Sequence, residues 1–426
     1  MAVAGLAVAA VVVLALLVGV HRYLWRRFVG DTTAEGSALR AAGTVAVYLL
    51  PLLSIGALVA GRTGAPFWLQ RVLAWPGYLW LAALLYLTLA LLVGEAVRPI
   101  LRRVLAGRAN ESSRSNRPSV TKVLTPEAAD APAAPAADIL VADAPAADTL
   151  AVPTRRLFVA RAVGGAAAVA GLGTVGHGTY GVLRGPRVKR ITVPLAKLPR
   201  SAHGFRIAVV SDIHLGPILG RAHTQRIVDT INRTQPDLVA VVGDLVDGTV
   251  ADLGPAAEPL ARLSARRGSF FVTGNHEYYS GAAQWIDHVR ELGLHPLENA
   301  RVEVDGFDLA GVNDIAGESE GRGPDFDRAL GDRDRTRAAV LLAHQPVVIH
   351  DAVAHGVDLQ LSGHTHGGQL WPGNLIAGLA NPTVAGLDRY GDTQLYVSRG
   401  AGAWGPPVRV GAPSDITVVE LASRQA

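Results

Sequence analysis

Residues 209–216 read VVSDIHLG, an apolar run that ends in a carboxylate and an imidazole two positions apart. The β-branched start of this run is typical of a buried strand. In an extended chain, residues i and i+2 point the same way, so Asp212 and His214 could hold one ion. Alone the motif is weak, because Asp-x-His is common by chance.

Four further stretches repeat this arrangement: LVAVVGD at 238–244, FFVTGNHE at 270–277, VLLAHQP at 340–346 and LQLSGHTHGGQ at 359–369. Their potential metal ligands are Asp244, Asn275, His344, and His364 with His366. Any one could be a turn or cap residue, but five successive blocks are very improbable by chance. Open α/β sheets place ligands beyond the carboxyl ends of their strands. We therefore expect these residues to face one crevice that holds metal.

Two local expectations follow from the glycines in these blocks. His364 and His366 lie two apart between glycines, so their side chains are expected to point one way. Gly274 is expected to allow a backbone bend that most other residues resist.

Strand-like and helix-like segments alternate from about residue 190 onward. Strands are expected at 205–211, 237–242, 269–273, 307–312, 338–343, 358–362, 393–398 and 415–421, and helices at 221–235, 256–266, 281–293 and 346–355. This alternation predicts an α/β domain in which a layered sheet is covered by helices.

Composition narrows the chemistry. The 426 residues include no cysteine, so thiolate sites and cysteine nucleophiles are excluded, and any metal is held by oxygen and imidazole nitrogen. The formal net charge of +4 could indicate nucleic acid, but many arginines lie beside apolar segments, as in membrane proteins. We expect no nucleic-acid partner.

The first 105 residues are predominantly apolar. Residues 2–20, 41–61 and 72–94 are each long enough to cross a bilayer, which takes about 20 apolar residues. A cleavable signal peptide is disfavoured, because its basic residues should precede the apolar run and here they follow it. We predict a membrane region at 1–105 with three transmembrane helices, in a multi-pass protein of the cell membrane whose partner is the lipid bilayer.

The remainder divides into three parts. Residues 106–154 are rich in Ala, Pro and Asp and predict a flexible linker. Residues 155–185 have two interpretations, a fourth transmembrane helix over 162–183 or a twin-arginine-like signal anchor that begins at Arg155 and Arg156. The catalytic domain is placed at 190–423.

Basic residues indicate the topology. The loop after the first span and the segment after the third are rich in arginine, whereas the loop after the second holds only Arg62 and Arg71. Because basic loops stay in the cytoplasm, a fourth span would carry the catalytic domain out of it. The opposing observation is that 162–183 is only weakly hydrophobic and is followed by basic residues. If this segment lies flat on the membrane, the domain stays cytoplasmic.

The five blocks, intact and in order, resemble the calcineurin-like metallophosphoesterase superfamily, whose pattern is D-x-H, G-D-x-x-D, G-N-H-E, a lone His and G-H-x-H. The resemblance covers residues 200–420, approximately. GHTHGGQ at 363–369 and YVSRG at 396–400 are similar to the membrane-attached bacterial branch and to the family called transmembrane protein with metallophosphoesterase domain. The resemblance implies an α/β fold, a layered β-sandwich flanked by helices, after the transmembrane region.

Transferred position by position, the resemblance implies two metal ions. Its ligands would be Asp212, His214 and His366 for one ion, Asn275, His344 and His364 for the other, and Asp244 bridging both. His276 would be the catalytic residue beside the phosphate. Asp247 is expected to support a ligand or a turn, and Glu277 to be structural, whereas Arg399, Arg409 and Asp314 stay undecided. The donors suit divalent or trivalent Mn, Fe or Zn and do not choose among them.

Such a site implies a membrane-anchored phosphoesterase that hydrolyses a phosphodiester or pyrophosphate bond by attack of a metal-bridged hydroxide. The expected substrate is a phosphorylated small molecule or lipid, and analogy with relatives suggests a lipid-linked one such as UDP-diacylglucosamine. The alternative is a non-catalytic membrane sensor or transporter component with a metal- or phosphate-binding domain. The complete ligand set favours catalysis.

Overall fold

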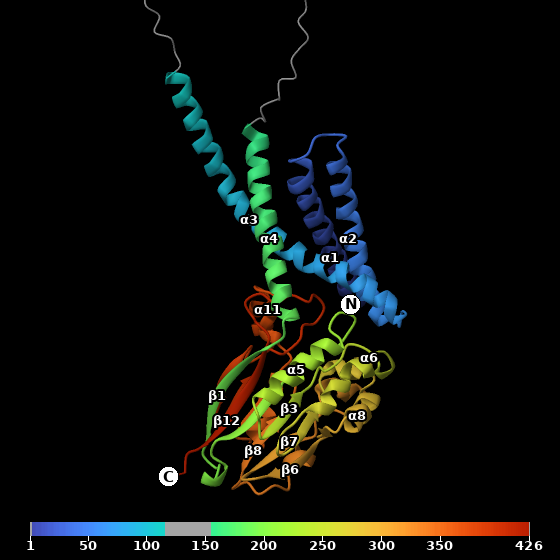
Figure 1. The fold of residues 1–426 in the computed structure, drawn as a ribbon, viewed down its shortest axis with the longest axis vertical. Coiled ribbons are helices and arrows are strands. Elements are labelled where there is room, and N and C mark those ends of the chain that lie inside the picture. The colour runs from blue at the N-terminus through green and yellow to red at the C-terminus, as the bar shows by residue number, and fades with distance from the viewer. Residues whose placement is uncertain (1, 116–154, 426) are drawn as a thin grey trace, which may run out of the picture. The chain divides into compact units, whose positions relative to one another are not determined.

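The computed structural model describes residues 2–115 and 155–425. They fall into two compact units, one formed by 1–44 with 88–169 and the other by 45–87 with 170–426. The second unit contains the whole α/β domain, which the ribbon in Figure 1 shows from green to red.

Within residues 2–115 and 155–425, four helices are long and apolar enough to cross a membrane. They are α1 (Ala2–Leu24), α2 (Ala38–Arg62), α3 (Phe67–Ser115) and α4 (Arg155–Leu183). Each predicted span lies within one of them. The candidate span in α3, Phe67–Gly107, has 41 residues, which at 1.5 Å per residue is about twice the 30 Å thickness of a hydrocarbon core, so only part of α3 can span.

The start of the predicted linker is helical. The sequence analysis placed a flexible segment at 106–154, but α3 continues to Ser115. Residues 106–115 read AGRANESSRS, in which Ala, Arg and Glu favour a helix, and no proline occurs in the sequence between Pro99 and Pro118. The prediction for 116–154 concerns residues that lie outside the described ones.

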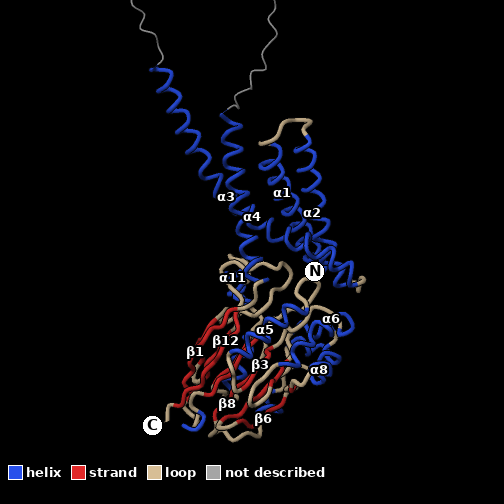
Figure 2. The backbone as a smooth tube through the Cα atoms, in the orientation of Figure 1, coloured by secondary structure: helices blue, strands red, loops and turns tan. Residues whose placement is uncertain are grey.

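The α/β domain is a sandwich of two six-stranded sheets, whose strands are red in Figure 2. The first sheet has the order β1 (Arg187–Leu195), β12 (Asp415–Ser423), β2 (Phe205–Val210), β3 (Leu238–Val242), β4 (Ser269–Val272) and β5 (His295–Pro296). The second has the order β10 (Gly386–Tyr390), β11 (Thr393–Val397), β9 (Leu359–Ser362), β8 (Ala338–Leu342), β7 (Phe307–Gly311) and β6 (Ala300–Val304). The layered α/β fold predicted from the sequence is therefore confirmed.

Successive side chains of a strand point to opposite faces of its sheet and therefore enter different hydrophobic cores. In β2, Ile207 and Val209 enter the core between the sheets, whereas Ala208 and Val210 join an outer core. That outer core is closed by α5 (Arg221–Arg233), α6 (Val250–Ala257) and α8 (Ala282–Glu291). On the second sheet, α9 (Phe326–Leu330) and α10 (Ile349–Ala354) close a third core. The order of layers is helix, sheet, sheet, helix.

Strand direction brings the five motifs to one edge. β2, β3 and β4 are parallel, as are β7, β8, β9 and β11. The central strands are buried throughout and rich in Val, Leu and Ala, as expected for strands covered on both faces. The carboxyl ends of β2, β3 and β4 thus meet at one edge of their sheet, and those of β8 and β9 at one edge of the other.

All eight predicted strands are present, but the sequence analysis missed β1, β5, β6 and β10. β1 is rich in Arg and Lys and contains Pro194, which an edge strand tolerates; its pairing with β12 starts the domain at Arg187 and not at residue 190. The helix predicted at 256–266 was wrong. The helix begins at Val250, where Thr249 caps it, and Glu258–Arg262, which includes Pro259, forms a 3-10 turn.

Candidate metal centre

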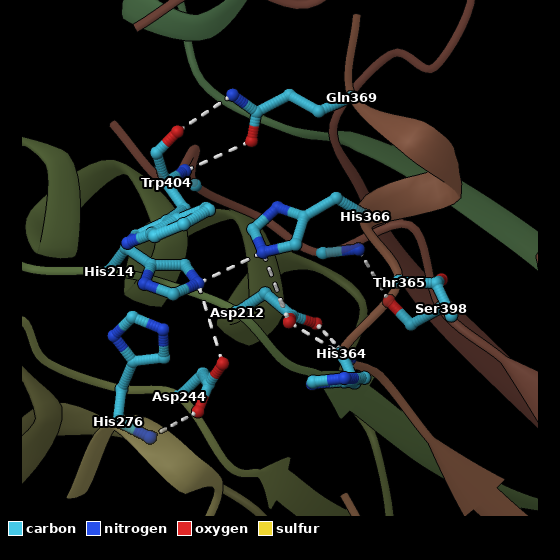
Figure 3. A network of polar contacts seen from close by, with 12 residues as sticks. Asp212, His214, Asp244, His276, His364, Thr365, His366, Gln369, Ser398 and Trp404 are labelled. Carbon is cyan, nitrogen blue, oxygen red and sulfur yellow. Dashed lines mark hydrogen bonds and ion pairs between the residues drawn. The ribbon is translucent and has the colours of Figure 1, made fainter. Parts of the chain in front are cut away.

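Each predicted site residue lies just beyond the end of a strand. Asp212 and His214 follow β2, Asp244 follows β3, Asn275 begins α7 (Asn275–Ser280) after β4, His344 follows β8, and His364 and His366 follow β9. Potential ligand atoms gather in three groups, each within 4.8 Å: Asp212 with His214 and His366, Asp244 with His344 and His364, and a third in which His214 is shared with Asp247 and His276. The first two contain the predicted ligands. Figure 3 shows Asp212 and His214 from the loop after β2, Asp244 from the loop after β3, and His364 and His366 from the loop after β9 as they converge.

The first group contains two imidazoles that face each other. His214 Nε2 lies 3.0 Å from His366 Nε2, and the latter lies 3.4 Å from Asp212 Oδ1. The explanation offered from the sequence was wrong here. Asp212 and His214 do not follow an extended chain, because both have left-handed backbones with φ of 50° and 47°. Their side chains meet because the chain curls after β2.

The second group is built around Asp244. Its Oδ2 lies 3.1 Å from His344 Nε2 and 3.7 Å from His214 Nε2, so this carboxylate stands between the two groups. Asn275 Oδ1 lies 3.0 Å from His364 Nδ1. The prediction that His364 and His366 point one way was wrong, since each belongs to a different group. Their φ angles of 73° and 52° turn the loop between them.

Hydrogen bonds on the far side of two rings orient them toward the groups. His344 Nδ1 donates to the carbonyl of Val242 at 2.9 Å, and His214 Nδ1 donates to Asp247 Oδ1 at 2.9 Å. In the neutral ring, Nε2 is then an acceptor, which is the form that binds metal. His344 Nε2 makes no hydrogen bond of regular geometry among the described residues, but it lies 3.1 Å from Asp244 Oδ2. An imidazole nitrogen and a carboxylate oxygen buried face to face, with further imidazole and amide donors beside them, fit a metal ion.

Backbone strain concentrates at this site. Among the described residues other than glycine, eight have positive φ, and five of them are Asp212, His214, Asp244, His364 and His366. Such conformations are unfavourable for residues with a Cβ and persist where the surroundings hold them. The strain is typical of a functional site.

Gly274 is required by space and not by its backbone. The sequence analysis expected a bend there, but its φ of −104° is open to any residue. A Cβ would lie 2.3 Å from Asp244 Oδ1 and 2.5 Å from the Asp244 amide nitrogen. Gly363 is similar, since its Cβ would lie 2.4 Å from Asp212 Oδ2. Both glycines let two strand ends approach.

Glu277 joins two of the loops. Its carboxylate accepts hydrogen bonds from the amides of Asp244, Leu245 and Gly274 at 3.0, 2.7 and 2.6 Å. Burial, with the nearby charge of Asp244, raises the pKa of Glu277 to about 7. These contacts agree with the structural role predicted for this residue.

Burial and the neighbouring charged side chains raise the pKa of some groups in the site and lower the pKa of others. Burial lowers the pKa of His214, but the carboxylates of Asp247 and Asp244 outweigh it and raise the pKa to about 9. Burial and, secondly, the neighbouring His344 lower the pKa of His364 to about 4. Burial raises the pKa of Asp247, but two adjacent histidines outweigh it and lower the pKa to about 2.

His276 lies beside the metal-ligand groups. Its Nδ1 is 2.7 Å from Asp247 Oδ1, and its backbone amide donates to Asp244 Oδ1 at 2.9 Å. The rings of Tyr279 and Trp404 lie with centroids 5.4 and 5.7 Å from its own. The sequence analysis missed both aromatics. Tyr279 follows GNHE closely enough to be suspected, but Trp404 has no local signal.

The sequence left open whether Arg409 and Asp314 bind substrate, and in the structure both form hydrogen bonds to other protein groups. Arg409 is buried and donates to the carbonyls of Gly402, His366 and Ala412, and its Nη2 lies 3.1 Å from His366 Nδ1. Asp314 accepts from Ala316 and from Gln345 through Oδ1. Arg409 therefore braces His366, and it has few donors left for a phosphate.

The calcineurin-like phosphoesterase family pattern matches residues 205–368. A transmembrane protein with metallophosphoesterase domain from Danio rerio is 39% identical over 259 residues, which are 58% of this chain and 59% of that protein. An uncharacterized metallophosphoesterase from Helicobacter pylori is 38% identical over 253 residues, 59% of this chain and 68% of its own length. A crystal structure of a dimetal phosphatase from Danio rerio matches with a TM-score of 0.37 and 13% identity, over 52% of this chain and 93% of that one.

This chain belongs to the calcineurin-like metallophosphoesterase family. It spans less than two thirds of the length of the Danio rerio relative. Four helices among the described residues are long and apolar enough to cross a membrane, and the Danio rerio relative is named as a transmembrane protein.

Proposed function

We propose that this chain is a membrane-anchored hydrolase that uses two metal ions to cleave a phosphoester or phosphoanhydride bond. The supporting observation is the convergence of the predicted ligands in two adjacent groups, with Asp244 between them and its Oδ2 against the buried His344 Nε2. Asp212, His214 and His366 would hold one ion, and Asn275, His344 and His364 the other. When bound, such ions lower the pKa of water and polarise the phosphoryl oxygens.

Side chains beside the metal ligands would bind the substrate and transfer protons. His276 shares a third group of possible ligands with His214 and Asp247, beside the two groups assigned to the ions, and in this proposal it binds a phosphoryl oxygen or protonates the leaving alkoxide. Asp247 accepts from both His276 and His214, which ties the orientation of the catalytic ring to that of a ligand ring. Tyr279 and Trp404, exposed at 74% and 53%, flank His276 and can contact the substrate's non-reacting part.

The metals would be Mn, Fe or Zn, and the scissile bond a phosphodiester or pyrophosphate. By analogy with relatives, we propose a lipid-linked substrate such as UDP-diacylglucosamine. A non-catalytic sensor is disfavoured, because a binding module has no need for a complete ligand set with a further histidine beside it.

Hydrolysis of bis(p-nitrophenyl) phosphate by the full-length chain in detergent, after loading with Mn, tests the proposal. We expect turnover that EDTA abolishes and that His344→Ala and His364→Ala lose. His350→Ala is a matched control, because His350 is exposed and belongs to none of the groups. No turnover by the wild-type chain with Mn, Fe or Zn would refute the function.

We also propose that the catalytic domain lies outside the cytoplasm, as the arginine distribution predicts. Alkaline phosphatase fused after residue 190 should then be active in intact cells. A fluorescent protein at the same position that fluoresces in the cytoplasm, without phosphatase activity in the first fusion, would refute this topology.

A further inference from the structure

The segment that follows His366 exposes an unusual number of apolar side chains. Helix α11 (Gly373–Ala380) has no buried residue, and Leu375, Ile376 and Leu379 are exposed at 66%, 71% and 88%. Trp371, just before the helix, is exposed at 54%. Single exposed apolar residues are ordinary, but a contiguous group marks an interaction surface.

This segment is held firmly against the domain. Trp371 donates its amide to the carbonyl of Val410 at 3.0 Å, and Gln369 exchanges hydrogen bonds with the backbone of Trp404. Gly368 packs so closely on α11 that a Cβ there would lie 2.2 Å from the amide nitrogen of Asn374. The apolar face is therefore presented in a defined position beside the metal-ligand loops, at one end of the sandwich (Figure 2).

Two membrane-length helices contact this end of the domain within the same compact unit. The hydroxyl of Tyr86, in α3, donates to the carbonyl of Trp371 at 3.0 Å. Gly178, in α4, accepts from the amide of Arg409 at 3.4 Å, and a Cβ at Gly178 would lie 2.7 Å from Val408. The exposed segment thus adjoins two helices that are suited to a bilayer.

The chemistry of the segment favours lipid over a protein partner. Residues 367–387 contain no Asp, Glu, Lys or Arg, although charged residues make up 18% of the chain. A protein partner usually meets a rim of charged and polar groups, whereas insertion into a membrane requires their absence. Tryptophan beside aliphatic side chains is typical of residues that enter the interfacial region.

We propose that Trp371 and α11 insert into one leaflet of the bilayer and hold the metal centre at the membrane surface. This placement lets the enzyme take a phosphoester whose non-reacting part is an acyl lipid anchored in the same leaflet. The second statement rests on the proposed hydrolase function, whereas the first does not.

Because the chain has no cysteine, one residue can be labelled without background. Leu379→Cys carrying an NBD fluorophore, in the full-length chain reconstituted in vesicles of phosphatidylcholine and phosphatidylglycerol, should show blue-shifted emission that lipids spin-labelled on the acyl chain quench. The matched control is Val353→Cys on α10, which is exposed at 37% and belongs to the outer surface of the second sheet. Equal, water-like emission at both positions would overturn the insertion.

The substrate statement has a separate test. Leu375→Ser with Ile376→Ser and Leu379→Ser should leave hydrolysis of soluble bis(p-nitrophenyl) phosphate unchanged and reduce hydrolysis of CDP-diacylglycerol in vesicles by about tenfold or more. Equal loss on both probes, or a wild-type chain that cleaves only the soluble probe, would overturn it. A wild-type chain that cleaves neither refutes the proposed function, and quenching at position 379 would still support insertion.

Discussion

Asp247 accepts hydrogen bonds from two histidines through one oxygen, at 2.9 Å from His214 and 2.7 Å from His276. Asp247→Ala removes this acceptor, so His214 loses the partner that orients its Nε2 and His276 loses its tether. The pKa of Asp247 is lowered to about 2, so the carboxylate is ionised near neutral pH, and its interactions with the histidines weaken only as the pH falls from about 4 toward 2.

The expected size follows from this geometry. Losing the hydrogen-bond partner of a metal-ligating histidine typically weakens metal binding or activity by about 10–100-fold, or about 1.4–2.7 kcal/mol. We expect that loss of affinity for the one ion bound by Asp212, His214 and His366. Because His276 is released as well, kcat should remain low even when metal saturates the protein.

Metal titration by calorimetry, followed by turnover at saturating Mn, separates the two effects. Asp247→Asn keeps an oxygen acceptor and should lose less than Asp247→Ala. Asp327→Ala, whose side chain is 94% exposed, is the control for loss of a carboxylate. Wild-type affinity for both ions together with wild-type kcat in Asp247→Ala would refute the reasoning.

Three further predictions concern individual groups. Asp244→Asn should abolish turnover and lower the metal content, because Asp244 lies between both ligand groups; near-wild-type turnover with both metals bound would contradict the bridging assignment. His276→Ala should lower kcat by about 10²–10⁴ while metal content, measured by mass spectrometry, stays close to that of the wild type. An empty site in that variant would show that His276 is a ligand. Metal affinity should rise with pH by about one logarithmic unit per pH unit between about pH 6 and 8, because binding displaces the proton that His214, with a pKa of about 9, otherwise holds. Calorimetry in buffers of different ionisation enthalpy checks this, and an affinity independent of pH would contradict it.

The sequence by itself determined the predicted ligands and the strands that deliver them. Each block is local, since an apolar strand and the polar residue after it lie within a few positions, and parallel strands end at a common edge. The same holds for the four apolar helices, whose length and hydrophobicity need no tertiary contact to be recognised. Such patterns show whether a segment is a helix or a strand and which residue follows its end.

Only the tertiary structure decided how these residues meet. The left-handed backbones of Asp212 and His214, the separation of His364 from His366, and the approach of Gly274 to Asp244 all depend on loops from different strands packed together. Trp404 beside His276, β1 beside β12 and Trp371 beside Tyr86 pair segments that lie far apart in sequence. Periodicity reports the neighbours a residue has along its own strand or helix, and it carries no information about partners brought near by the fold.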